Sequence, residues 1–175
     1  MPRLVRGDLP LSRLSDKIKS YQAYHQDPRN RLFHFLGVPT VTFSILIPMG
    51  LIRLSTLHSQ FTVASLFVLG TLLYYFSLDR MIAALVSVFI LPLLVAANYV
   101  ASPSFSNTGW VFGVSFVLGW IFQLIGHYFE GRRPALLDNF GQIFSAPLFL
   151  MAELLFGLGF RSDLRDQLSP PPNDL

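Results

Sequence analysis

The stretch MIAALVSVFILPLLVAANYVA, from Met81 to Ala101, decides the fold. It carries no charged residue, and an α-helix needs about 20 apolar residues to cross the roughly 30 Å hydrocarbon layer of a membrane. Three further stretches share its apolar character: Phe33–Ile52, Phe61–Leu78 and Trp110–Phe129. A helix bonds its backbone polar groups internally, so it can span lipid where an open strand cannot. The sequence therefore predicts an all-α, polytopic membrane helix bundle with four spans.

A fifth apolar run, Gly141–Phe160, differs from these four because Pro147, Glu153 and two glycines interrupt it. Such residues are tolerated at membrane depth where the backbone packs against protein rather than lipid. We therefore expect a re-entrant helix or a fifth C-terminal helix here. The chain is predicted to form a single membrane domain over 1–175, with three parts: a basic interfacial segment over 1–32, the helix bundle over 33–160 and a polar tail over 161–175.

The composition also indicates a membrane protein. Of the 175 residues, 52% are hydrophobic and 13% are charged, and the mean hydropathy is +0.50. Seven of the 13 Lys and Arg residues lie in the first 31 positions. Basic residues beside a first span are explained by membrane orientation and anionic headgroups, so the net charge of +3 does not indicate nucleic acid. Without cysteine, any metal must be bound by nitrogen and oxygen. Nothing in the sequence fixes the oligomeric state.

The N-terminal segment has the pattern of an amphipathic helix. Leu11, Leu14, Ile18 and Tyr21 recur at intervals of three and four, which places them on one helix face. The segment is polar and basic and lacks the continuous apolar run of a cleavable export signal. We therefore expect a helix that lies at the membrane surface.

The arginines indicate the orientation of the bundle. Arg29 and Arg31 precede the first span, and Arg132 and Arg133 follow the fourth. Because cytoplasmic loops are enriched in Lys and Arg, we expect both segments on the cytoplasmic face.

Four polar residues fall near this face: His25, His34, His127 and Glu130. Ionisable side chains at membrane depth are costly and mark functional sites by default. His127 and Glu130 are three residues apart and project from one side of a helix, an arrangement with which helix bundles bind iron. We therefore treat the four as candidate metal ligands. The alternative is that they are hydrogen-bonded residues at the membrane boundary.

The other polar residues have simpler interpretations. His58 lies in a loop expected on the opposite side of the membrane and is interpreted as an ordinary surface residue. Glu153 is either a supplementary ligand or a carboxylate bonded to Arg132, Arg133 or a backbone group. The two arginines either anchor the membrane surface or bind a substrate carboxylate.

Three glycines recur along the fourth predicted span, at Gly113, Gly119 and Gly126. Small residues let two membrane helices approach closely. We expect these positions to face a neighbouring helix.

Two longer motifs make the site more specific. The first is YHQDPRNRLFHFLGVP, from Tyr24 to Pro39, and the second is WIFQLIGHYFEGRRPAL, from Trp120 to Leu136, followed by Asp138-Asn139 and the stretch 146–149. In this order, and separated by apolar spans, they resemble the iron-dependent 2-hydroxy fatty acid dioxygenase family. Its members are small multi-span proteins of the yeast endoplasmic reticulum and of many bacteria. The resemblance covers roughly residues 21–153 and leaves out both termini.

The resemblance implies a substrate, a cofactor and a set of residue roles. Members of that family use Fe2+ and molecular oxygen to convert a 2-hydroxy fatty acid into the fatty acid one carbon shorter. By resemblance His25, His34 and His127 bind the iron. The resemblance also makes Glu130 a fourth ligand or a base beside the iron. The candidate catalytic residues are Glu130, Arg132 and Arg133.

The implied route is chelation of iron by the hydroxyl and carboxylate of the acid, then oxygen binding and cleavage between its first two carbons. The membrane would be a bacterial inner membrane or the endoplasmic reticulum, with the metal site on the cytoplasmic face and the acyl chain among the spans.

Other classes of protein stay open at this stage. A non-enzymatic lipid-binding or transport protein would use the same histidines to bind headgroups or protons and would consume no oxygen. Zinc hydrolysis is a further alternative, because zinc accepts three histidines with a carboxylate or water. A di-iron hydroxylase or desaturase would need more ligands than the four histidines of this chain supply.

Overall fold

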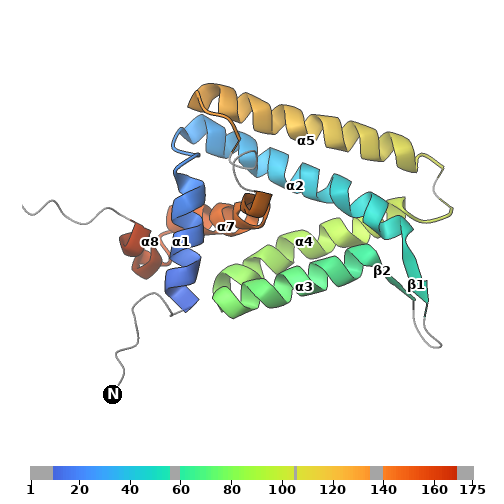
Figure 1. Ribbon diagram of the computed structural model, residues 1–175, viewed down its shortest axis with the longest axis horizontal. Coiled ribbons are helices and arrows are strands. Elements are labelled where there is room, and N and C mark those ends of the chain that lie inside the picture. The colour runs from blue at the N-terminus through green and yellow to red at the C-terminus, as the bar shows by residue number, and fades with distance from the viewer. Residues whose placement is uncertain (1–9, 56–59, 105, 135–139, 169–175) are drawn as a thin grey trace, which may run out of the picture.

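Helices make up most of the chain that the computed structural model describes, namely residues 10–55, 60–104, 106–134 and 140–168. In Figure 1, α2 to α5 lie lengthwise beside one another and α1 crosses one end of them. The prediction of an all-α bundle is confirmed. The elements in chain order are α1 (Pro10–Gln22), α2 (Pro28–Leu51), β1 (Arg53–Ser55), β2 (Gln60–Thr62), α3 (Val63–Leu78), α4 (Arg80–Val100), α5 (Thr108–Glu130), the 3-10 helix η1 (Phe140–Phe144), α7 (Ser145–Gly157) and α8 (Ser162–Leu168).

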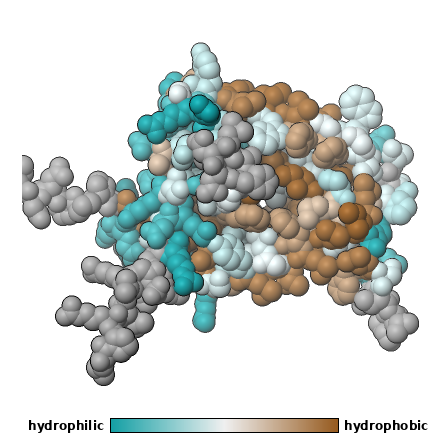
Figure 2. Space-filling model, in the orientation of Figure 1, coloured by the Kyte–Doolittle hydropathy of each residue, from teal (hydrophilic) through white to brown (hydrophobic). Residues whose placement is uncertain are grey.

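Three of the described helices, α2, α4 and α5, are long and apolar enough to cross a membrane. The second predicted span, Phe61–Leu78, corresponds to α3, which is equally apolar but has 16 residues, about 24 Å at 1.5 Å per residue. It is shorter than the predicted stretch because Gln60–Thr62 pair with Arg53–Ser55 as a small antiparallel hairpin. Figure 2 shows hydrophilic residues gathered at the end that carries α1 and α8, and hydrophobic surface along the long helices.

The C-terminal apolar run is part of a broken helix, as its glycines predicted, while Pro147 lies within the first turn of α7 and does not interrupt it. The segment that includes α7 meets α8 at an angle of 116°. Gly159 and Arg161 take positive φ values of 79° and 60° in the bend. Arg161 donates to the Asp79 carboxylate at 2.6 Å, which ties the bend to the start of α4. Most side chains of α7 are buried, and the helix packs against α1, α2 and α4.

The apolar face of α1 is covered by protein. Leu14, Ile18 and Tyr21 are buried, and α1 packs against α7, α8 and α3. The side chain of Leu11 lies outside the described part of the chain. The predicted amphipathic helix therefore forms, and it closes the end of the bundle beside the histidines.

The most extensive contact between two elements joins α2 and α5. Two glycines of α5 allow this contact. A Cβ atom at Gly119 would lie 2.9 Å from the backbone nitrogen of Val41, and one at Gly126 would lie 2.5 Å from Oδ1 of Asn30. The expectation for Gly113 is wrong, since a Cβ there would meet no described atom within 4 Å.

Replacing Gly119 by alanine should destabilise the bundle, because the new methyl group would overlap the Val41 backbone. We expect a loss of about 1–3 kcal/mol, measured as a lower midpoint of thermal unfolding in detergent. Gly113→Ala on the same helix is the matched control. There alanine favours the helix by about 0.5–1 kcal/mol, so the midpoint should stay or rise. Equal losses in both variants would contradict the role of close helix approach.

Candidate metal centre

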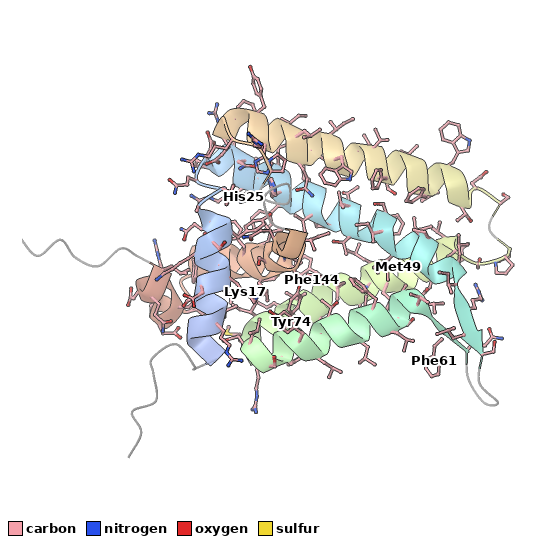
Figure 3. The ribbon with its side chains drawn as sticks, viewed as in Figure 1. Lys17, His25, Met49, Phe61, Tyr74 and Phe144 are labelled. Carbon is pink, nitrogen blue, oxygen red and sulfur yellow. The ribbon has the colours of Figure 1, made fainter. Side chains whose placement is uncertain are left out.

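Three histidines from separate parts of the chain meet at one end of the α2–α5 pair. His25 lies in the turn between α1 and α2, His34 in the second turn of α2, and His127 in the last turn of α5. All three are buried, and each offers one ring nitrogen such that these atoms lie within 4.8 Å of one another. Figure 3 shows His25 where α1 approaches the start of α2 and the end of α5. Within the described chain this group has the composition and spacing to hold a metal ion.

Hydrogen bonds to the backbone fix the tautomers of His25 and His34. Nδ1 of His25 lies 2.8 Å from the carbonyl oxygen of Tyr21, and Nδ1 of His34 lies 2.9 Å from that of Asn30. A carbonyl oxygen can only accept, so each Nδ1 carries the proton. In the neutral rings each Nε2 then presents a lone pair, and the two Nε2 atoms face each other at 3.1 Å. Two facing lone pairs repel each other unless a proton or a metal ion lies between them, and the geometry of the neutral rings fits a metal ion.

The surroundings of His25 keep it neutral. Burial, reinforced by the neighbouring His34, lowers the pKa of His25 to about 3. The His25 ring also stacks on the ring of Tyr21, with centroids 4.0 Å apart and planes 3° from parallel. Because metals bind neutral imidazole, His25 needs to lose no proton at neutral pH to act as a ligand.

Glu130 lies beside the histidines but its carboxylate is already bonded. Oε1 accepts from the backbone N–H of Gln26 at 2.9 Å, and Oε2 accepts from that of Asp27 at 2.9 Å and from Nδ2 of Asn30 at 3.0 Å. These bonds hold the turn that carries His25 against the end of α5. The Glu130 carboxylate therefore positions the segment that carries His25.

The other predicted residues are placed around this turn. Arg132 donates to the carbonyl oxygen of Ala23 at 3.2 Å, and Arg133 is exposed. Glu153 pairs with Arg31 at 2.6 Å instead of with the predicted arginines, because α7 packs beside the start of α2. His58 and Asp138-Asn139 lie outside the described residues.

A cavity of about 70 Å³ opens onto the three histidines. Its wall is formed by α1, α2, α5 and the segment η1–α7. Away from the histidines the wall along α2, from Val38 to Ile45, is apolar except for Thr42. Trp120 and Gln142 also line it, and each has one buried polar side-chain atom without a hydrogen-bond partner among the described residues. The cavity therefore offers polar contacts near an apolar passage.

Three residues that shape the site were not predicted from the sequence: Tyr21, Asn30 and Gln142. A signal for two of them was present, because Tyr21 precedes His25 by four residues and Asn30 precedes His34 by four. This is the spacing at which a helical carbonyl meets a side chain one turn later. Gln142 gave no such signal, since tertiary packing alone brings it to the cavity.

The fold and site define a class: an all-α protein with membrane-length helices and a buried group of three histidines that could hold a metal ion. The chain belongs to the 2-hydroxy-palmitic acid dioxygenase Mpo1-like family, whose model matches residues 11–158. It is 36% identical over 158 residues to the 2-hydroxy-palmitic acid dioxygenase MPO1 of Saccharomyces cerevisiae, covering 89% of this chain and 87% of that protein. No solved structure matches the chain significantly. The family indicated by the two motifs is confirmed.

Glu130→Ala should lower the affinity of the site for Fe2+ by about 10- to 100-fold, as expected when a residue that orients a ligand is lost. The physical reason is that the turn carrying His25 loses three hydrogen bonds. The measurement is an anaerobic Fe2+ titration of the purified protein in detergent, where excess Fe2+ should restore occupancy. The control is Asp163→Ala, which removes an exposed carboxylate on α8. Complete loss of binding at any Fe2+ concentration would instead identify Glu130 as a direct ligand.

Proposed function

We propose that this protein is a non-haem Fe2+-dependent dioxygenase that converts 2-hydroxy fatty acids into fatty acids one carbon shorter, a reaction of fatty acid α-oxidation. The observation that carries the proposal is the buried histidine group, in which the Nε2 atoms of His25 and His34 face each other at 3.1 Å. Family membership supports it, because the yeast relative is by name a 2-hydroxy-palmitic acid dioxygenase.

Iron suits the donor set of this site. His25, His34 and His127 would hold it through neutral nitrogens and leave positions open for other ligands, as non-haem iron oxygenases require. Bound there, Fe2+ would supply a binding site for the hydroxyl and carboxylate oxygens of the acid and the redox chemistry that lets oxygen react. Glu130 keeps the His25 turn in place while substrate enters.

The reaction balances without a separate reductant. R–CH(OH)–COOH and O2 give R–COOH, CO2 and H2O, so the bond between the first and second carbons breaks and the second carbon gains oxygen. The electrons that leave the acid are those that reduce O2 completely. The protein therefore needs to bind the acid and oxygen together and to exclude other electron donors, which a small buried cavity favours.

The residues around the cavity suit the polar end of such an acid. Pro134 lines the cavity and follows Arg133, whose exposed guanidinium can bind a carboxylate through two N–H groups. Trp120 lines the same cavity, and its Nε1 is a hydrogen-bond donor that has no partner among the described residues. We assign Arg133 to attraction of the substrate carboxylate and Trp120 to a polar contact inside the cavity.

Oxygen uptake should occur with 2-hydroxypalmitate and not with palmitate, because only the former offers iron two oxygens on adjacent carbons. One O2 should be consumed per acid shortened, without added reductant, and CO2 should be released. The measurement combines an oxygen electrode with mass spectrometry of the acids. Equal turnover of both acids would defeat the chelation mechanism, and full activity in metal-free protein would defeat the assignment.

His25→Ala, His34→Ala and His127→Ala should each lose iron and this activity while the protein stays folded in detergent. His58→Ala is the control within the same residue type, since the sequence places it in a loop remote from the motifs. Iron content by metal analysis and oxygen uptake should stay near wild type in the control. A comparable loss in His58→Ala would contradict the proposed ligand set.

The metal site should face the cytoplasm. The motivation is the arginines beside the site, Arg29, Arg31, Arg132 and Arg133, because basic residues flank the cytoplasmic ends of spans. A reporter fused after Pro134 should report a cytoplasmic location, and one fused after Ser104 the opposite side. The reverse pattern would contradict the orientation.

A further inference from the structure

A second cavity lies directly behind the histidine cavity. It is formed between α2, α4 and α7, and its volume is also about 70 Å³. The two cavities share Val38 and Thr42 as a common wall, and Ala146 and Pro147, adjacent in α7, line one cavity each. We call this second cavity the tail groove.

The tail groove differs from the histidine cavity in its chemistry. No described residue that lines it is charged, and Thr42 alone among them carries a side-chain hydroxyl. Phe35, Phe89 and Met151 are among the residues that form the rest of the surface. Apolar walls of this kind favour a hydrocarbon ligand over a polar one.

The histidine cavity and the tail groove are equally small, with volumes of about 70 Å³ each, so neither alone encloses a long acyl chain. An acid whose polar end lies at the histidines must therefore extend out of the histidine cavity, and the tail groove begins on the other side of Val38 and Thr42.

The tail groove also reaches the apolar exterior of the bundle. Phe89 lines it and is 49% exposed on the outer surface of α4, next to Val88, which is 67% exposed. Since α4 is one of the helices that can cross a membrane, this exposed side would face lipid in a bilayer. The groove thus connects the hydrocarbon layer with the wall of the histidine cavity.

We propose that the tail groove receives the acyl chain of the 2-hydroxy acid from the bilayer and sets the preference for long chains. The proposal rests on the proposed function for the identity of the polar end. In this arrangement the acyl chain lies between α2, α4 and α7 and passes Val38 and Thr42. The first two carbons of the acid then lie at the histidines.

The first test compares two substitutions on α4. Leu93 lines the groove and is half-buried, whereas Val95 is 70% exposed and lies outside it. Leu93→Trp should lower the ratio of kcat/KM for 2-hydroxypalmitate to that for 2-hydroxyhexanoate by about tenfold or more, since each methylene excluded from an apolar site costs binding energy. Val95→Trp should leave the ratio at its wild-type value. A Leu93→Trp variant that keeps the wild-type ratio overturns the proposal.

The second test does not depend on turnover. The chain has no cysteine, so Leu93→Cys and Val95→Cys each carry one thiol that a maleimide can modify. In anaerobic detergent solution, 2-hydroxypalmitate should slow modification of Leu93→Cys several-fold and leave Val95→Cys unchanged, while 2-hydroxyhexanoate should protect neither. A thiol at position 93 that is unreactive throughout, or that reacts equally with and without the long acid, overturns the proposal.

The two tests separate this inference from the proposed function. Wild-type protein that oxidises neither acid would refute the dioxygenase reaction, while protection at position 93 would still establish the groove as an acyl site. Wild-type turnover without an effect at position 93 in either test would refute the groove alone.

Discussion

The close approach of α2 and α5 is the constraint on which the site depends. It exists because Gly126 has no side chain where Asn30 and His34 come near, and Gly119 has none where Val41 passes. A side chain at either glycine would overlap atoms of α2. His127 therefore reaches His34 because the backbones touch.

The second requirement is that a turn outside the long helices delivers His25 to the same place. The Glu130 carboxylate holds this turn through two backbone N–H groups, and Asn30 completes the arrangement through its side-chain amide. Tyr21 fixes the ring of His25 from the other side by stacking and by its carbonyl oxygen. The helix that supplies His127 thus also positions His25, which couples the three histidines in one unit.

The location of the site follows from the same architecture. Polar groups that would be costly within hydrocarbon lie at one end of the spans, next to the hydrophilic surface that α1 and α8 provide (Figure 2). The tail groove lies on the side of α2 that faces α4 and α7, near the exposed apolar surface of α4. An acid with a polar end and a long apolar tail matches this division, because each part meets surroundings of its own kind.

The sequence by itself determined the all-α class, the apolar helices, the family and the three histidines, because hydrophobic runs and close-set motifs are local patterns. It also predicted a break in the C-terminal run, which lies at its glycines, while Pro147 lies inside α7. Only the tertiary structure decided that Glu130 bonds the Gln26–Asp27 backbone, that Glu153 pairs with Arg31, and that Gly113 faces no neighbour. Those facts depend on which helices meet and at what register, and contacts between residues about 100 positions apart leave no trace in a single sequence's periodicity.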